Sequence, residues 1–417
     1  MQVAHLSYSD LDGGAARAAW RLHRALREAG ADSRMWVHRR QSDDWAVQGP
    51  DTLGARLKTE VRILAGHTLS RVLGGDRPAL PTLAALPSGL PARARRQGAD
   101  LLHLHWIGGE VASVGEIGRL AAPAVWTLHD LWPFCGAEHY PDGERWQPGY
   151  TRANRPAGEP GWDVDRWVWA RKRRHWRRPL QLVAPSRWMA GRAAASALMG
   201  GWPCRVIPNA IDIERWAPVD AAPARRLLGL PPDVPLLLFG ASGGGSDPRK
   251  GFDLLAEALG RLRAAGTHPR LELAVFGQGP PRQPPVLSHP VHWLGRLQDD
   301  ASLRLCYAAA DAFVLPSRQD NLPNTGVEAL ACGTPVVAFD VGGLPDLVDP
   351  GRTGHLARPG DTDDLARGIA WALDPARQPA LRAQCRAKAV ATFSAPEVAR
   401  QHLALYAELR DGAAGAS

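Results

Sequence analysis

Short apolar runs alternate with segments of helical periodicity in this chain of 417 residues, and the alternation occurs in two successive blocks. An apolar run of about four to eight residues between polar, glycine or proline residues is typical of a buried strand. A strand, a helix and a further strand in succession form a parallel βαβ unit. We therefore expect an α/β fold with two doubly wound domains. The expected strands are residues 3–8, 34–38, 101–106, 124–129 and 182–185 in the first block, and 236–240, 271–276, 291–294, 312–315 and 336–339 in the second.

The boundary between the two blocks is predicted from a cluster of turn-prone or acidic residues. Residues 217–233 contain seven of them, which is typical of a linker: Pro218, Asp220, Pro223, Gly229, Pro231, Pro232 and Asp233. We predict an N-terminal domain of residues 1–216 and a C-terminal domain of residues 217–394. An amphipathic pattern at residues 395–409 predicts that the terminal helix, residues 395–417, packs back on the N-terminal domain. Residues 42–96 are rich in proline, glycine and arginine, and no elements are predicted there.

The composition is that of a soluble globular protein, with 45% apolar and 22% charged residues. The first residues read as a strand rather than a signal peptide, and no apolar run is long enough to span a bilayer. Five cysteines without close pairs argue against a disulfide framework or a zinc site, so we expect a cytoplasmic location. The net charge of +8 predicts anionic partners, namely phosphates, an acidic membrane surface or nucleic acid.

Glycines follow the first expected strand of each block, at the sheet edge where open α/β folds bind ligands. Gly13 and Gly14 precede a helix, and they allow a phosphate or a sugar to approach the backbone closely. A tight turn without a ligand is the alternative, and the G-x-G-x-x-G spacing of a nicotinamide site is absent. In the second block a glycine-rich loop at residues 241–246 leads to Arg249 and Lys250. Two such cations suit a diphosphate, with an exposed basic loop as the alternative. Residues 275–279, with two glycines after a strand, are a weaker signal of the same kind.

Asp320 and Glu328 are the most informative pair of acids. Asp320 lies in a loop rich in proline and asparagine, and Glu328 lies inside the helix that the loop opens. The helix N-terminus offers backbone N–H groups and a positive dipole end to a diphosphate. The two carboxylates can then bind hydroxyls of a sugar and of a ribose. Acids that only stabilise a helix dipole are the alternative, but Glu328 lies too far into the helix for that role. The pair therefore predicts a nucleotide-sugar site.

Histidines follow or occupy several expected strands. His129 is a candidate for polarising a substrate or anchoring a sugar hydroxyl, with a structural role as the alternative. His103 and His105 share one face of their strand, and we favour a structural role for both. His129 and His139 lack an obvious third ligand, so we predict no metal site there.

Residues 162–178 combine tryptophans with six lysines and arginines between positions 171 and 178. A basic and aromatic surface suits a membrane interface with anionic lipids, or single-stranded nucleic acid. A solvated helix face with tryptophans in the core is the alternative. Of the two partners we favour the anionic membrane surface, at the inner face of the cytoplasmic membrane, and we expect no nucleic acid.

Together these motifs resemble those of the retaining glycosyltransferases of family 4, which have the GT-B fold. The resemblance covers nearly the whole chain, and residues 320–339 are its most specific part. Residues 128–140 and 319–325 resemble a bacterial subgroup that acts in exopolysaccharide assembly, including colanic-acid-type enzymes. The other motifs that carry the resemblance are Gly13-Gly14, His129, Pro185-Ser186, and residues 207–212, 248–251 and 276–279.

The resemblance implies two Rossmann-like domains that face each other across a cleft. The N-terminal domain would bind the acceptor and the C-terminal domain the nucleotide sugar. Glu328 would bind the ribose hydroxyls, and Asp320 would contact the transferred sugar. His129 would lie beside that sugar, and Gly14 near the phosphate. The groups expected to hold the diphosphate are Arg249, Lys250 and the backbone of Pro323, Asn324 and Thr325.

Two departures from the family pattern are evident. The first acid of the family is usually glutamate, whereas Asp320 is one methylene shorter, so its reach or its sugar preference is expected to differ. The family often has an arginine soon after the first strand of the second domain. Residues 241–246 contain none, so one phosphate cation is either missing or supplied elsewhere, with Arg249 as the candidate.

The expected reaction is sugar transfer from a nucleotide-diphosphate sugar to a saccharide or lipid-linked acceptor, in cell-surface polysaccharide synthesis. We expect His129, Lys250 and Asp320 to be catalytic, with Lys250 and Arg249 stabilising the leaving diphosphate. No carboxylate is evident as a nucleophile, so a front-face mechanism with retention is expected. No metal is expected, because cations and helix dipoles neutralise the charge. The alternatives are a sugar-nucleotide epimerase or a sugar phosphorylase on the same fold, and a non-catalytic nucleic-acid-binding protein.

Overall fold

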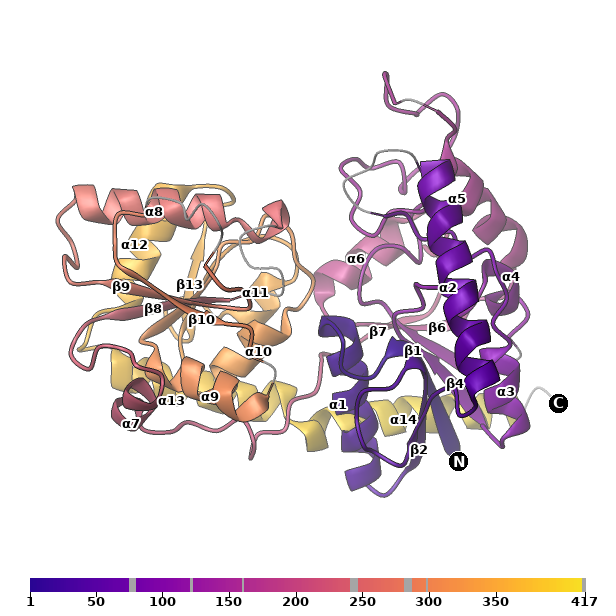
Figure 1. Cartoon of the computed structure of the whole chain (residues 1–417), viewed down its shortest axis with the longest axis horizontal. Coiled ribbons are helices and arrows are strands. Elements are labelled where there is room, and N and C mark those ends of the chain that lie inside the picture. Colours follow the sequence, from indigo (N-terminus) through magenta and orange to yellow (C-terminus); the bar gives the residue numbers. More distant parts are fainter. Residues whose placement is uncertain are drawn as a thin grey trace. The chain divides into compact units, whose positions relative to one another are not determined.

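Two parallel β-sheets organise the chain, as the alternating pattern predicts. A computed structural model describes residues 1–74, 80–120, 123–159, 161–240, 247–280, 287–297 and 299–414. It divides the chain into two compact units, each built around one sheet and coloured by sequence in Figure 1. The first unit comprises Met1–Pro208 with Val398–Ser417, and the second comprises Asn209–Glu397. The two units are described one at a time.

The first unit contains a seven-stranded sheet in the order β3-β2-β1-β4-β5-β6-β7. The strand order changes direction between β1 and β4, which is the point where open α/β sheets bind ligands. Its strands are β1 (Gln2–Ser9), β2 (Asp32–Arg39), β3 (Val47–Gln48), β4 (Leu101–Leu104), β5 (Ala124–Thr127), β6 (Gln181–Ala184) and β7 (Cys204–Val206). Its helices are α1 (Gly14–Glu28), α2 (Leu53–Gly74), α3 (Leu90–Arg96), α4 (Val114–Ile117), α5 (Val164–His175) and α6 (Arg187–Ala195).

The second unit contains a six-stranded sheet in the order β10-β9-β8-β11-β12-β13, with the change of direction between β8 and β11. Its strands are β8 (Leu236–Gly240), β9 (Glu272–Phe276), β10 (Val291–Gly295), β11 (Ala312–Leu315), β12 (Val336–Phe339) and β13 (Gly354–Ala357). Its helical elements are α7 (Ala221–Leu227), η2 (Pro248–Lys250), α8 (Phe252–Ala264), α9 (Asp300–Ala309), α10 (Asn324–Ala331), α11 (Leu344–Leu347), α12 (Thr362–Ala372) and α13 (Gln378–Phe393).

Buried side chains explain why the strands form where they do. The burial pattern of β8, β11 and β12 is continuous, because helices cover both faces of the sheet. Phe313 and Leu315 of β11 face one apolar cluster, and Ala312 and Val314 face another. Because successive side chains of a strand point to opposite faces of the sheet, one sheet contributes to both apolar clusters.

The linker predicted at residues 217–233 is wrong. Residues 221–227 form α7, whose N-cap Asp220 accepts a hydrogen bond from the backbone N–H of Ala222 at 3.0 Å. Arg225 is buried, and it donates to the carbonyl of Ala309 at 2.9 Å and to Asp311 at 2.9 Å. Pro218, Pro231 and Pro232 therefore flank a helix of the second unit, and Pro223 lies in its first turn, where a proline is tolerated.

The units meet in sequence at Pro208 and Asn209, earlier than the expected boundary after residue 216. Residues 209–216 belong to the second unit, where Trp216 is buried and Ile211 forms a parallel bridge with Ser394. Residues 42–96, for which no elements were predicted, contain β3, α2 and α3.

The last helix, α14 (Ala395–Ala414), contributes from Val398 onward to the first unit. Its Tyr406 is fully buried and shares a hydrogen bond of 2.6 Å with Nδ1 of His103 on β4. Among the described residues, no helix is both long and apolar enough to cross a membrane. All five cysteines are free thiols.

Candidate functional site

At the carboxyl edge of the second sheet, a lysine and an aspartate from distant parts of the chain meet. Nζ of Lys250 donates to Oδ2 of Asp320 at 2.6 Å, across 70 positions of sequence. Lys250 ends η2, in the connection between β8 and α8, and Asp320 lies in the connection between β11 and α10. Both connections leave the point where the strand order reverses. The structure thus brings together Lys250 and Asp320, two of the residues that the sequence singled out.

Backbone contacts fix the two connections against each other. The N–H of Arg318 donates to the carbonyl of Arg249 at 2.7 Å, and the Arg318 guanidinium forms an ion pair with Asp253 of α8 at 2.5 Å. Gly251 has a φ of 66°, and a Cβ there would lie 1.9 Å from the carbonyl oxygen of Pro316. Only glycine fits this approach, so Gly251 helps to bring Lys250 to Asp320.

Asp320 is buried and has several polar contacts besides Lys250. Its Oδ1 accepts from the N–H of Asn321 at 3.1 Å, and its carbonyl accepts from the N–H of Gly343 at 3.0 Å. Gly342 has a φ of 58°, and a Cβ there would lie 2.0 Å from the Asp320 carbonyl oxygen. The position of the aspartate is therefore determined by the backbone of two loops.

Glu328 lies in the second turn of α10 and is buried. The hydroxyl of Tyr307, from α9, donates to Oε2 of Glu328 at 2.9 Å. Burial and the neighbouring carboxylate raise the pKa of Tyr307 well above its ordinary value, so the hydroxyl stays a donor. Tyr307 was missed at the level of sequence, because a tyrosine 21 positions before Glu328 carries no motif. It fixes the orientation of the acid.

The N-terminus of α10 begins directly after Pro323, its N-cap residue. Asn324 opens the helix, and its Oδ1 accepts from Nδ2 of Asn209 at 3.2 Å. The same amide of Asn209 donates to the carbonyl of Leu322 at 3.2 Å. Asn324 and Thr325 thus form a first turn whose N–H end carries the positive pole of the helix.

The predicted diphosphate cations have different partners. Arg249 forms an ion pair with Asp247 at 2.6 Å, whereas Lys250 is bound to Asp320. The glycine-rich loop at residues 241–246 lies outside the described residues. The weaker motif at residues 275–279 contains the end of β9, after which Gly277 has a φ of 95° and its N–H donates to the carbonyl of Gly295 at 2.8 Å.

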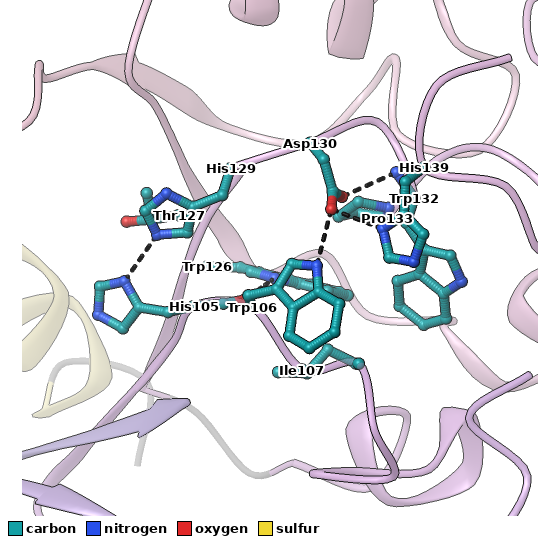
Figure 2. Close-up of a pocket in the computed structure, with 11 residues that line it drawn as sticks. His105, Trp106, Ile107, Trp126, Thr127, His129, Asp130, Trp132, Pro133 and His139 are labelled. Atoms are coloured by element: carbon teal, nitrogen blue, oxygen red, sulfur yellow. Dashed lines mark hydrogen bonds and ion pairs between the residues drawn. The ribbon is translucent and has the colours of Figure 1, made fainter. Parts of the chain in front are cut away.

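In the first unit a pocket opens beside the carboxyl ends of β4 and β5, and Figure 2 shows its lining. Asp130 is one of the lining residues, and its Oδ2 accepts from Nε1 of Trp106 at 2.9 Å and lies 2.6 Å from Nδ1 of His139. Burial alone would raise the pKa of Asp130, but His139 and the N–H donors hold it below its usual value. The carboxylate is therefore charged and paired in the pocket.

His129 lines the same pocket, and its Nε2 lies 3.0 Å from Nδ1 of His105. Burial lowers the pKa of His129 to about 4, although Asp130 opposes the shift. The ring is therefore neutral near pH 7, and it can exchange hydrogen bonds with hydroxyl groups but adds no positive charge. Gly13 precedes α1 with a φ of 89°, and Gly14 is the first residue of that helix.

A buried histidine array extends from His129 into the sheet. Nε2 of His105 lies 2.9 Å from Nδ1 of His5 on β1, and His103 bonds both Tyr406 and Thr127. Nitrogens of His5, His103 and His105 lie within 4.8 Å of one another, as in a metal site. Both nitrogens of His103 and of His105 already have hydrogen-bond partners, so the geometry fits a polar network better than a metal centre. This agrees with the structural role predicted for His103 and His105.

The basic and aromatic segment at residues 162–178 is only partly a surface. Trp169 and Trp176 are buried, and Lys172 is fully buried on α5. Nζ of Lys172 donates to the carbonyls of Trp132, Cys135 and Gly136. The exposed cations of the segment are Arg173, Arg174, Arg177 and Arg178.

Comparisons with known proteins agree with this architecture. Residues 12–215 match a family model described as Glycosyltransferase Family 4, and residues 236–374 match one described as Glycosyl transferases group 1. A D-inositol 3-phosphate glycosyltransferase of Actinosynnema mirum is 37% identical over 49% of this chain, and the match spans about half of that relative, 52%. D-inositol 3-phosphate glycosyltransferase 1 of Catenulispora acidiphila is 31% identical over 86% of this chain and 85% of its own length.

Solved structures show the same fold at low sequence identity. Sucrose-phosphate synthase of Thermosynechococcus elongatus superposes with a TM-score of 0.70 at 22% identity, and the match covers 99% of this chain and 100% of that one. Anabaena HepE in complex with UDP-glucose superposes with a TM-score of 0.64 at 18% identity, over 98% and 100% of the two chains.

Proposed function

This chain belongs to glycosyltransferase family 4 and has the GT-B fold, and from that premise we propose that it is a retaining hexosyltransferase. The donor is a nucleotide-diphosphate sugar, held by the second unit. The observation that carries the proposal is the meeting of Lys250 and Asp320 beside the N-terminus of α10, the helix that also carries Glu328. The cation and the helix N-terminus suit a diphosphate, and the two buried acids can accept hydrogen bonds from the hydroxyls of the groups on either side of it.

Each side chain has a distinct part in this proposal. Lys250 and the first N–H groups of α10 bind the diphosphate, and Arg249 adds a second cation once it leaves Asp247. Glu328, oriented by Tyr307, accepts hydrogen bonds from the ribose. Asp320 accepts from the hydroxyls of the sugar. Because Asp320 also binds Lys250, sugar and diphosphate recognition share one ion pair.

The bond that breaks joins the anomeric carbon of the sugar to a phosphate oxygen. Positive charge develops on the sugar and negative charge on the leaving diphosphate, so Lys250 stabilises the transition state more than the bound substrate. The leaving oxygen accepts the proton of the acceptor hydroxyl, which attacks from the same face. The products are the nucleoside diphosphate and a glycoside with retained configuration, and the charge is neutralised without a metal.

The roles of Gly13, Gly14 and His129 toward the donor stay predictions from the family resemblance. His129 presents a neutral ring at the pocket of the first unit. We propose that this pocket belongs to the acceptor side, where the Asp130–His139 pair offers a carboxylate to acceptor hydroxyls. The acceptor is a saccharide or a lipid-linked saccharide of cell-surface polysaccharide synthesis, handled at the cytoplasmic face of the membrane.

The test is a transfer assay with UDP-, GDP-, ADP- and TDP-sugars, followed by assignment of the anomeric configuration of the product by NMR. UDP-glucose is the first donor, because HepE binds it, and inositol 3-phosphate joins the acceptor panel because of the names of the relatives. We expect retention and a loss of about 100-fold or more in kcat for Lys250→Met. An inverted product would refute the mechanism, and a change in the configuration of the donor's sugar without an acceptor would identify an epimerase instead.

A further inference from the structure

Three histidines form a continuous row of hydrogen bonds from the pocket of the first unit into the interior of its sheet. Nε2 of His129 lies 3.0 Å from Nδ1 of His105 (dashed in Figure 2), and Nε2 of His105 lies 2.9 Å from Nδ1 of His5. His129 and His105 line the pocket, whereas His5 on β1 is fully buried. We call His129, His105 and His5 the histidine row. Each contact in it joins Nε2 of one ring to Nδ1 of the next.

The tautomers of the three rings depend on one another. Burial lowers the pKa of each ring, so all three are neutral near pH 7. A neutral imidazole carries one hydrogen, and a hydrogen bond between two of its kind needs one hydrogen between the nitrogens. The hydrogens of the histidine row therefore all lie on Nδ1 or all lie on Nε2, because any other combination leaves one contact with two hydrogens or with none. The tautomer of His129 is thus tied to that of His5, two rings away.

The inner end of the histidine row decides between the two arrangements. Nε2 of His5 is buried and has no hydrogen-bond partner within the part of the chain that the structure describes. The ring of His103 lies beside His5, but its nitrogens are bonded to Tyr406 and Thr127. A buried N–H without an acceptor is rarer in proteins than a buried acceptor without a donor. The interior therefore favours hydrogens on Nδ1, which leave only a lone pair at Nε2 of His5.

We propose that the histidine row holds His129 in the Nδ1–H tautomer, with His105 as the positioning residue and the closed end at His5 setting the direction. Free histidine in water favours Nε2–H, but in a protein the hydrogen bond at one ring nitrogen decides which nitrogen carries the hydrogen. Because Nε2 of His129 accepts from His105, the other nitrogen of the ring is a donor, suited to an oxygen that accepts. The value of this donor for sugar transfer rests on the proposed function, whereas the tautomer itself does not.

The tautomer is measured in the full chain labelled with ¹⁵N-histidine, by two-bond ¹H–¹⁵N correlation spectra that distinguish protonated from unprotonated ring nitrogens. The signals of His129 are identified by their loss in His129→Gln. We expect the hydrogen on Nδ1 of His129 near neutral pH. A hydrogen on Nε2 in the unchanged protein would overturn the proposal, and this result needs no variant of the histidine row.

Two substitutions at the inner end of the row have opposite expected results. In His5→Asn the amide takes the place of Nδ1 and can donate or accept, so both arrangements are satisfied. We expect the Nε2–H tautomer of His129 to appear, and kcat of sugar transfer to fall about fivefold, because only molecules with the Nδ1–H tautomer are active. His5→Leu is the matched control. Its side chain can neither donate nor accept, the closed end moves to His105, and His129 should keep its hydrogen on Nδ1.

A role of His5 in packing alone would leave the tautomer of His129 unchanged in both variants, and that result would overturn the proposal. A changed tautomer with unchanged kcat would support the histidine row and contradict the role of His129 in the proposed function. A metal ion that copurifies in stoichiometric amount and is lost in His5→Leu would also overturn the proposal, because it would occupy nitrogens that the row uses.

Discussion

A single buried hydroxyl orients the acid that we assign to the ribose. The Tyr307 hydroxyl donates to Glu328, and the tyrosine ring packs against Phe276, Phe313 and Trp216. Loss of the hydroxyl alone would leave the ring packing in place and remove one hydrogen bond from the carboxylate. Tyr307 is thus a positioning residue, distinct from the groups that touch the donor.

We predict that Tyr307→Phe weakens donor binding about 10-fold, since a hydrogen bond to a charged group contributes about 1.5 kcal/mol. Calorimetric titration with the preferred nucleotide sugar measures the effect, and KM should rise more than kcat falls. Tyr406→Phe is the matched control, because it removes an equally buried hydroxyl from the first unit. A donor affinity unchanged in Tyr307→Phe would contradict the role of Tyr307.

Asp320 departs from the family pattern, because its side chain is one methylene shorter than the usual glutamate. A substitution can test this difference directly. Lys250 reaches it at 2.6 Å, so Asp320→Glu would move the carboxylate by about one methylene toward the lysine or past it. We predict that Asp320→Glu changes the ratio of kcat/KM between two sugars on the same nucleotide by about 10-fold, while the affinity for the free nucleoside diphosphate changes little. Equal losses for both sugars would show that Asp320 does not set the sugar preference.

At the scale of elements, α5 is anchored by its one buried cation. Lys172 donates to three backbone carbonyls of the segment after β5, and its Nζ lies 3.6 Å from the centre of the Trp132 ring. Burial lowers the pKa of Lys172 to about 7. The segment that carries Asp130 and His139 therefore depends on α5 for its shape.

We predict that Lys172→Met lowers the free energy of unfolding of the first unit by about 3 kcal/mol, because three buried carbonyls lose their donor. Urea unfolding followed by tryptophan fluorescence measures the change. Arg173→Met, at the adjacent exposed position, should shift the free energy by no more than about 0.5 kcal/mol. Similar effects in both variants would show that the three contacts do not anchor the segment.

The elements that the sequence predicted correctly include the uniformly buried strands. The central strands β8, β11 and β12 are buried on both faces and read as plain apolar runs. The edge strand β7 is short and largely exposed, and α2 has apolar residues on two faces, so neither shows a simple period. Helix α7 was read as a linker because its flanking prolines dominate the local pattern.

At the candidate site, the sequence singled out residues but not their contacts. Motif spacing singled out Lys250, Asp320 and Glu328. The Lys250–Asp320 ion pair joins two separate connections of the sheet, so local sequence patterns do not predict it. Tyr307 and the Asp130–His139 pair also depend on tertiary packing. Buried tryptophans beside exposed arginines looked like one surface, because a sequence does not separate the two faces of a helix that mixes them.

At the scale of the whole molecule, the histidine array makes the first unit sensitive to acid. The array also includes His402 of α14, whose ring centre lies 5.7 Å from that of His103. Burial lowers the pKa of His129 and of His402 to about 4, and it places those of His5, His103 and His105 well below the ordinary value. These rings are neutral in the folded chain but take up protons near pH 6.5 when unfolded. Between about pH 6.5 and 4 the unfolded state binds more protons, so stability falls as the pH falls.

We predict a melting temperature that declines between pH 7 and pH 5, and a smaller decline in His402→Leu, because one buried imidazole is removed. Calorimetry across this range measures both. The exposed His67 provides the control, since His67→Gln should leave the pH dependence unchanged. If the melting temperature fell equally with pH in His402→Leu and in the unchanged protein, a contribution from the array would be excluded.

The position of α14 affects the order in which the units are completed. The ribosome makes residues 1–208 first, yet His402, Leu405 and Tyr406, which are buried in their unit, are made after the whole of the second unit. Until then His103 lacks its tyrosine partner, whereas Asn209–Glu397 is already complete. All residues of the second unit are therefore made before the first unit is complete, and the first unit lacks the packing of α14 until residues 398–414 have been made.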